Sequence, residues 1–325
     1  MPEPFSYQLG EKVSTLLKGN VEGHVHFDPY TRGRYSTDAS IYQIAPFGVV
    51  VPKTIQDLVS TVEIAAEHNI PILSRGGGTS QCGQTVNEAI VIDCSQYLNK
   101  IVNFDYENMR ISVEPGIVLD HLNSYLKPHN LFFPVDISTA SRATIGGMTA
   151  NNSCGGRSIR YGIMVDNVHS IDALLINGEH ARFSDTPSDI RHIDGTKHYR
   201  QLVSSVREIA EREKSALETY FPKVKRRVGG YNLDTIDPQG HNMAKLLVGS
   251  EGTLATFKNI ELYLQQVPQH KVMGVCHFPT FYAAMDAAQH LVKLGPVAVE
   301  LIDRTMIELA RNIPIFKSTI DSFVK

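Results

Sequence analysis

The chain has 325 residues, of which 42% are hydrophobic and 20% are charged, and its formal net charge is −3 at pH 7. This size and composition are typical of a soluble globular protein with two or three lobes. The sequence shows no excess of basic residues of the kind that binds nucleic acid. It has no apolar run of the roughly 18 residues that a membrane helix needs, and its start lacks the basic and apolar regions of a signal peptide. We therefore expect a cytoplasmic protein.

Helix and strand signals alternate along the chain. The first half predicts a helix over residues 4–18, a helix from the cap at Lys53 and Thr54 to His68, a hairpin over 101–113, and a helix over 116–126 that Pro128 stops. The second half predicts a hairpin over 168–183 with Asn177 and Gly178 at its turn, a charged helix over 199–220, and a strand over 255–267. Strands in hairpins rather than in regular βαβ alternation indicate an α+β fold.

The most informative segment is a glycine-dense loop over residues 75–86, which we call the glycine loop. It lies between two short apolar runs, residues 70–73 and 89–93, that predict strands. Three consecutive glycines allow positive φ angles and expose successive N–H groups, and such a row of amides binds phosphates. Arg75 adds a positive charge at the entrance of the loop. Gly77 and Gly78 are therefore expected to tolerate no side chain.

Several patterns compete for this loop. The dinucleotide fingerprint fits Gly76 and Gly78 but meets Gln81 at its third glycine, and it expects a helix where the sequence offers a strand. The P-loop pattern of a nucleotide hydrolase has Gln84 in place of its lysine. A strand–loop–strand cradle for a diphosphate needs neither helix nor lysine and fits best. An ordinary glycine-rich turn is the remaining alternative.

Two further motifs follow in series. Residues 134–168 contain two glycine pairs around side-chain amides, and residues 249–254 read Gly-Ser-Glu-Gly-Thr-Leu. With the glycine loop, they make the chain resemble the vanillyl-alcohol-oxidase and p-cresol-methylhydroxylase (PCMH) superfamily of FAD enzymes over roughly residues 40 to 310. The strings at 141–148 and 226–234 are most similar to the D-2-hydroxyacid dehydrogenase branch, and in particular to the flavin module of bacterial proteins that also carry iron–sulfur domains.

The resemblance implies which residues contact FAD. The diphosphate is expected on Arg75, Gly76, Gly77, Gly78, Thr79, Ser80, Gly83, Gln84 and Thr85. The path from adenine to isoalloxazine is expected along Pro134, Ile145, Gly146, Gly147, Asn151, Ser153, Gly155 and Tyr161. The residues expected to close the site are Glu251, Gly252, Thr253 and Leu254.

The resemblance also implies a domain organisation. A helical extension over 1–40 precedes a two-lobed PCMH-type FAD-binding domain over 41–267, with lobes of about 41–105 and 106–267. Residues 268–325 are expected to be the start of a ferredoxin-like cap domain. Its expected elements are a strand over 272–278, a helix over 280–294, a strand over 297–301 and a helix from Asp303.

By resemblance, the enzyme oxidises a D-2-hydroxyacid of the lactate, 2-hydroxyglutarate or glycolate class by hydride transfer to the flavin N5. In relatives, the rest of the cap supplies the base, the carboxylate clamps and the metal-binding histidines. The chain alone is therefore expected to be a poor dehydrogenase, and its electron acceptor is expected to be an iron–sulfur domain or subunit outside the chain. The alternative is an FAD-binding fragment or subunit without turnover.

Candidate catalytic residues are few. Arg226, Arg227, Tyr231 and Asn232 are the candidates, although Lys223 to Arg227 are equally well interpreted as a solvated basic run. The 13 histidines include none in a motif with partners. The cysteines, Cys82, Cys94, Cys154 and Cys276, form no C-x-x-C pair, so we expect no metal site and interpret them as small thiols.

Overall fold

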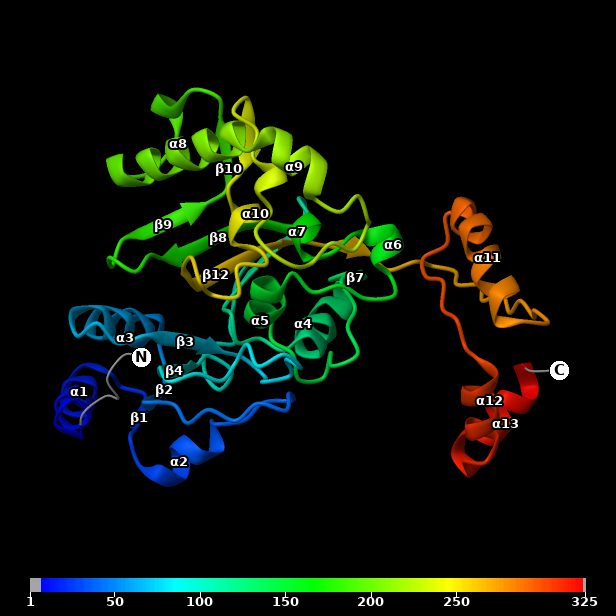
Figure 1. The fold of residues 1–325 in the computed structure, drawn as a ribbon, viewed down its shortest axis with the longest axis horizontal. Helices are drawn as coiled ribbons and strands as arrows, with labels where there is room; N and C mark the ends of the chain where they lie inside the picture. Colours follow the sequence, from blue (N-terminus) through cyan, green and yellow to red (C-terminus); the bar gives the residue numbers. More distant parts are fainter. Residues whose placement is uncertain (1–6, 324–325) are drawn as a thin grey trace.

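The computed structural model describes residues 7–323, which form two lobes around separate β-sheets, followed by a smaller C-terminal unit (Figure 1). The sheet of the first lobe has four strands. In spatial order they are β1 (His24–His26), β2 (Gly48–Val51), β4 (Ile90–Asp93) and β3 (Ile72–Arg75). β4 pairs in parallel with both β2 and β3, whereas β1 is antiparallel to β2.

Helices cover the first sheet. α1 (Tyr7–Asn20) and α3 (Ile55–Glu67) place Leu17 and Leu58 in one core with Ile90 and Ile92. α2 (Pro29–Arg34) leads to Tyr35, which packs with Val49, Val51 and Val91 in a separate cluster. Because α1 packs on α3 and β1 pairs with β2, the expected N-terminal extension is built into this lobe, although residues 4–6 of its helix lie outside the described residues.

The expectation of hairpins is wrong for this sheet, because β2, α3 and β3 form a parallel βαβ unit with β4 inserted between the two strands. Two parallel neighbours cannot be joined by a tight turn, since the chain must return along the sheet before the second strand begins. The glycine loop makes this return between β3 and β4 without a helix. The predicted strand–loop–strand order is therefore confirmed, with a parallel geometry.

The sheet of the second lobe has five antiparallel strands. In spatial order they are β5 (Ile101–Asp105), β6 (Arg110–Val113), β12 (Thr256–Tyr263), β8 (Val168–Leu174) and β9 (His180–Phe183). Both predicted hairpins are confirmed, and Gly178 has a φ of +81° at the turn between β8 and β9. In Figure 1 this sheet lies between α8 and α5, and the contacts of α5 with β12 and of Tyr199 with Phe183 agree.

The helices of this lobe are α4 (Leu119–Leu126), α5 (Ile145–Asn151), α6 (Ser158–Tyr161), α7 (Met164–Asn167), α8 (Lys197–Arg212), α9 (Lys214–Tyr220) and α10 (Ala244–Leu247). The helix predicted over 199–220 is divided into α8 and α9, because the chain leaves helical geometry at Glu213 (φ −93°, ψ 8°). The short elements are η1 (Lys127–His129), β7 (Leu131–Phe132), β10 (Asp185–Pro187), η2 (Ile190–His192), η3 (Leu233–Thr235), β11 (Gly240–Asn242) and β13 (Gln265–Gln266).

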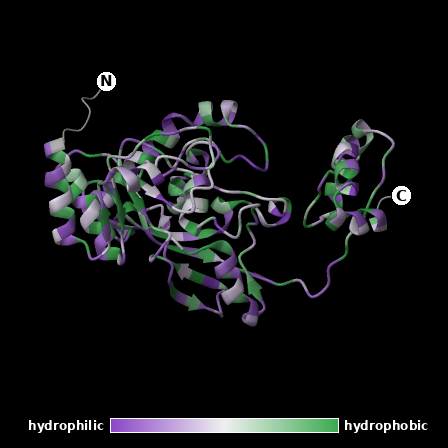
Figure 2. Cartoon of the chain, turned by 90° about the horizontal axis from the view of Figure 1, so that it is seen from below, coloured by the Kyte–Doolittle hydropathy of each residue, from purple (hydrophilic) through white to green (hydrophobic). Residues whose placement is uncertain are grey.

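The C-terminal unit is helical. Its elements are α11 (Phe281–Leu291), η4 (Val292–Leu294), α12 (Arg304–Arg311) and α13 (Pro314–Phe323). Both helices predicted here form, but the strands predicted over 272–278 and 297–301 do not, because neither segment pairs with another strand. No residue from 265 to 323 is buried, although Figure 2 shows hydrophobic residues throughout this unit and Val272 is 98% exposed.

Between residues 7 and 323, none of the helices has both the length and the apolar character that a membrane span requires.

The start of α3 gives a test of the first lobe. Asp57 is 2% exposed, and its carboxylate accepts hydrogen bonds from the backbone N–H groups of Glu22 (3.0 Å) and Lys53 (2.8 Å). We expect Asp57→Asn to destabilise the chain by about 2–3 kcal/mol, because charge-assisted bonds are lost and an amide faces buried donors. Glu63→Gln, on the exposed side of the same helix, should stay within about 0.5 kcal/mol. Urea unfolding would measure both, and equal midpoints would contradict the expectation.

Candidate functional site

Arg75 holds the glycine loop together. Its guanidinium donates to the backbone carbonyls of Tyr35 (3.2 Å), Thr37 (2.8 Å) and Thr85 (3.1 Å), and it lies 5.3 Å from the centre of the Tyr35 ring. Burial lowers the pKa of Arg75, and the nearby Asp93 opposes that shift. The side chain thus ties the start of the loop to its end and to the segment after α2. This contact set favours a structural role over direct phosphate binding.

The middle of the loop presents unused backbone donors. Within the part of the chain that the structure describes, the N–H groups of residues 76–81 donate no hydrogen bond. Gly78 and Gly83 have φ angles of +64° and +79°, which other residues adopt rarely. A run of free amides on a glycine backbone suits an anion such as a diphosphate.

The first two glycines lie against the second lobe. An ideal Cβ on Gly76 would be 2.1 Å from the Thr144 side-chain oxygen, and one on Gly77 would be 2.4 Å from the Arg142 carbonyl oxygen. The φ angle of Gly77 is not positive. The reason expected for its intolerance of a side chain is therefore corrected: the added atom would meet protein backbone.

The second motif forms the start of α5. Thr144 is the N-cap and accepts a hydrogen bond from the Gly147 N–H (3.2 Å). The Gly146 N–H donates to the Pro115 carbonyl (2.7 Å), and a Cβ on Gly146 would be 2.6 Å from the Pro115 side chain. Ile145 and Gly146 are consequently buried, which leaves Gly147 as the exposed position of this turn. A Cβ there would meet only the Thr144 hydroxyl, at 3.3 Å.

The three motifs meet at one carboxylate. Glu251 accepts a hydrogen bond from the Asn151 side-chain amide at the end of α5 (2.9 Å) and another from Gln84 of the glycine loop. Its own N–H donates to the Ala150 carbonyl (2.9 Å). Although Glu251 is exposed, partial desolvation of its carboxyl group raises its pKa, and the hydrogen bonds with Asn151 and Gln84 oppose the rise. We call the side chains of Gln84, Asn151 and Glu251 the clasp.

The remaining predicted residues lie along this region. Ser153 donates to the Asn151 side-chain oxygen (3.2 Å), and a Cβ on Gly155 would be 1.7 Å from the Asp136 carbonyl oxygen, next to the segment with the buried Pro134. Tyr161 packs edge-on against Phe132. Gly252 and Thr253 are exposed, whereas Leu254 packs against the core of the second lobe.

The candidate catalytic residues divide into two groups. Arg227 binds Asp234 and lies over the Phe221 ring, and Asn232 is 2% exposed and donates to the Lys245 and Val248 carbonyls. These contacts give both residues a structural role. Arg226 is exposed with Lys223 and Lys225, as a solvated basic run would be.

Tyr231 lies beside the third motif. It is 40% exposed, and its hydroxyl is 2.8 Å from the Thr253 hydroxyl, which also donates to the Ser250 carbonyl. Among the four candidates, Tyr231 is therefore the one whose polar group contacts a predicted cofactor residue.

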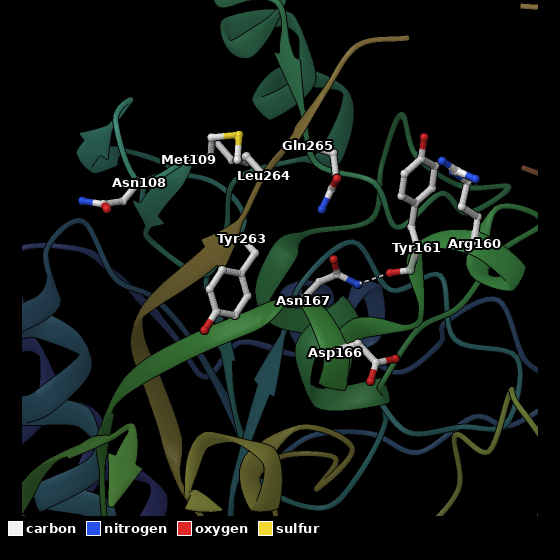
Figure 3. Close-up of a pocket in the computed structure, with 9 residues that line it drawn as sticks. All are labelled: Asn108, Met109, Arg160, Tyr161, Asp166, Asn167, Tyr263, Leu264 and Gln265. Carbon is white, nitrogen blue, oxygen red and sulfur yellow. Dashed lines mark hydrogen bonds between the residues drawn. The ribbon is translucent and has the colours of Figure 1, made fainter.

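A separate pocket of about 570 Å³ lies near Tyr161 (Figure 3). Its lining residues are Asn108, Met109, Arg160, Tyr161, Asp166, Asn167, Tyr263, Leu264 and Gln265. Only Tyr161 belongs to the predicted path, and Asn167 donates to its carbonyl (2.8 Å). Of the other lining residues, Arg160, Asp166 and Asn167 belong to the second motif, whereas the remaining five come from two segments outside the three motifs.

Two family matches agree with this geometry. Residues 46–184 match the family described as FAD binding domain, and residues 267–322 match FAD linked oxidases, C-terminal domain. These matches define the chain as a flavoprotein. The chain belongs to the FAD-linked oxidases of the PCMH type, and its cofactor is FAD.

Similar proteins are flavin-linked oxidoreductases by name. The chain is 31% identical over 323 residues to D-2-hydroxyglutarate dehydrogenase of Haemophilus influenzae. This alignment covers 96% of the chain and 31% of that protein. It is 30% identical to the mitochondrial D-lactate dehydrogenase [cytochrome] of Arabidopsis thaliana, in an alignment that covers 92% of this chain and 45% of that protein. It is 28% identical to glycolate oxidase subunit GlcD of Bacillus subtilis, where the alignment covers 87% of this chain and 52% of that protein. The chain thus spans about a third of the first relative and about half of the other two.

The fold also matches a solved structure. Alkyldihydroxyacetonephosphate synthase superposes with a TM-score of 0.66 at 18% identity, covering 100% of this chain and 55% of that one. At this identity the match supports the two-lobed PCMH-type fold, in agreement with the prediction.

The contact at Gly77 can be tested by adding one methyl group. We expect Gly77→Ala to lower stability by roughly 1–3 kcal/mol, because its Cβ overlaps the Arg142 carbonyl, and to weaken FAD binding by displacing the loop. Gly229→Ala is the matched control, since nothing lies within 4 Å of its Cβ position. Thermal unfolding with and without FAD would measure both effects. An unchanged melting temperature for Gly77→Ala would place the loop elsewhere.

Proposed function

We propose that the chain holds FAD where the glycine loop, α5 and residues 249–254 meet, as the flavin-binding part of a D-2-hydroxyacid dehydrogenase. The observation that carries this proposal is the clasp, because Glu251 joins the three motifs that the sequence places far apart. The free amides of residues 76–81 would hold the diphosphate. The exposed Gly147 and Gly252 leave room for a flat ligand against the backbone.

The names of the relatives support the substrate class: a small D-2-hydroxyacid such as lactate, 2-hydroxyglutarate or glycolate. Bound FAD would accept the hydride from the α-carbon of the substrate, which becomes a 2-oxoacid. The residues of this chain would bind and orient the cofactor, and the Tyr231 hydroxyl, which donates to the Thr253 hydroxyl, keeps an oxygen that can accept a hydrogen bond. None of the contacts described above places a histidine in this region, so we assign no base within the described residues.

Three further assignments belong to the proposal. The electron acceptor is an iron–sulfur domain or subunit outside this chain. The location is cytoplasmic, although similar proteins include mitochondrial ones. Residues 7–267 form the flavin-binding domain and residues 268–323 the start of the cap. The alternative function is an FAD-binding unit without turnover, which the structural roles of Arg227 and Asn232 favour.

Flavin reduction separates these functions. We expect the FAD-loaded chain to be bleached slowly by D-lactate, D-2-hydroxyglutarate or glycolate, because loss of a general base alone costs roughly 10²–10⁴-fold in rate. Anaerobic stopped-flow absorbance would measure it, with L-lactate and L-2-hydroxyglutarate as controls. An absence of bleaching over hours would support the unit without turnover. Rapid bleaching would contradict the assignment of no base and make Tyr231 the first residue to test.

A second prediction tests the location of the flavin. Gly147→Leu should weaken FAD binding severely, since the new side chain would occupy the exposed surface of α5 that we assign to the cofactor. Stability should change by less than about 1 kcal/mol, because leucine has a higher helix propensity than glycine and the only close contact is the Thr144 hydroxyl at 3.3 Å. Flavin fluorescence titration would measure affinity. Wild-type affinity in this variant would place FAD away from α5.

A further inference from the structure

The arginine at the entrance of the glycine loop is committed to the loop itself. Both terminal nitrogens of Arg75 donate to backbone carbonyls, three in all, on the loop and on the segment after α2. An ideal Cβ on Gly78 would be 2.8 Å from one of these nitrogens, so the guanidinium packs against the loop backbone. A phosphate on Arg75 would have to compete with these contacts, which leaves the site in need of another cation.

The charged groups that act on Arg75 are acidic. Asp93 and Asp38 both interact electrostatically with its guanidinium, and Asp38 also accepts a hydrogen bond from the Thr85 hydroxyl (2.9 Å). Glu251 is hydrogen-bonded to the far end of the loop. A diphosphate brings further negative charge to this neighbourhood, and like charges repel one another. Neutral backbone amides alone do not offset that repulsion, whereas a second guanidinium would.

Arg142 lies directly against the loop from the second lobe. An ideal Cβ on Gly77 would be 2.4 Å from the Arg142 carbonyl oxygen and 3.1 Å from its carbonyl carbon. The N–H groups of Arg142 and Ala143 both donate to the Thr139 carbonyl (2.8 and 2.9 Å), which fixes the backbone at this point. Because the carbonyl carbon is bonded to the Cα, the side chain of Arg142 begins beside Gly77, next to the free amides of residues 76–81.

The guanidinium of Arg142 is available. The residue is exposed, and within the part of the chain that the structure describes its side chain has neither a hydrogen-bond partner nor an ion pair. A guanidinium presents a planar fork of donors that matches two phosphate oxygens. A free cation on a long, flexible stem thus lies beside a row of free backbone donors.

We propose that Arg142 binds the diphosphate of FAD, and that Arg75 only shapes the loop. The amides of residues 76–81 hold the diphosphate from the first lobe, and the Arg142 guanidinium donates to its oxygens from the second lobe. The bound diphosphate therefore joins the two lobes. This inference rests on the proposed location of FAD.

The first experiment is an FAD titration by flavin fluorescence. Arg142→Gln should weaken FAD binding roughly 10- to 100-fold, because a charge-assisted contact is lost. Arg142→Lys should recover part of the affinity, since it keeps the charge but not the planar fork. Higher ionic strength should weaken FAD binding more in wild type than in Arg142→Gln. Arg212→Gln, which removes an exposed arginine from α8, is the matched control and should follow wild type.

A ligand series locates the contact. ADP carries the diphosphate and the adenosine half of FAD, whereas adenosine carries no phosphate. In displacement of bound FAD, Arg142→Gln should raise the concentration of ADP required, relative to that of adenosine, because only ADP has phosphate oxygens for the guanidinium. An equal loss for adenosine and ADP would contradict a contact with the diphosphate.

Thermal unfolding without FAD separates the two arginines. Arg75→Gln should lower the melting temperature, because backbone carbonyls lose their donor. Arg142→Gln should leave the melting temperature unchanged, since its side chain has no partner among the described residues. A lower melting temperature for Arg142→Gln would give Arg142 a structural role and overturn the inference.

The failure of this inference differs from the failure of the proposed function. Wild-type FAD affinity in Arg142→Gln would overturn the role of Arg142 and leave the location of FAD intact. A wild-type chain that is folded by circular dichroism yet binds no FAD would overturn the proposed function together with this inference.

Discussion

The close approach of the glycine loop to the backbone before α5 is the contact on which the arrangement of the two lobes depends. Cβ positions on Gly76 and Gly77 fall 2.1 and 2.4 Å from atoms of Thr144 and Arg142, well inside van der Waals contact. Any side chain at either position would push the lobes apart. The same absence of side chains leaves the loop amides uncovered, so one sequence feature serves the packing of the lobes and keeps donors free for the proposed diphosphate site.

The topology of the first sheet gives the loop its length and position. Because β3 and β4 are parallel neighbours, the connection must run back along the sheet, and on its way it contacts the backbone before α5 in the second lobe. Arg75 keeps this long connection compact by binding three carbonyls, including one at the far end of the loop. The clasp then fixes the loop to α5, so its conformation is determined from both lobes.

Local signals in the sequence predicted much of this structure. The cap at Thr54, the turn at Gly178 and the strands on either side of the glycine loop depend on neighbours within a few residues, and all are confirmed. The parallel pairing of β3 with β4 and the contact between Gln84 and Glu251 join segments far apart in the chain. No local pattern encodes such pairings. The resemblance grouped these motifs as one site, which stays a prediction, and it could not assign the structural roles of Arg75, Arg227 and Asn232.

The C-terminal unit also shows that a local pattern does not determine strand pairing. Its helices form because their backbone hydrogen bonds are internal, and Thr280 and Asp303 cap them as N-cap residues. The segments over 272–278 and 297–301 have the apolar pattern of strands, yet a strand exists only when a neighbour supplies its hydrogen bonds. The apolar pattern therefore shows only that a segment can pair as a strand, and a sheet forms only where a second strand lies beside it. The same holds for the proposed flavin site, where each motif is recognisable alone in the sequence but meets the other two only in the folded chain, around Glu251.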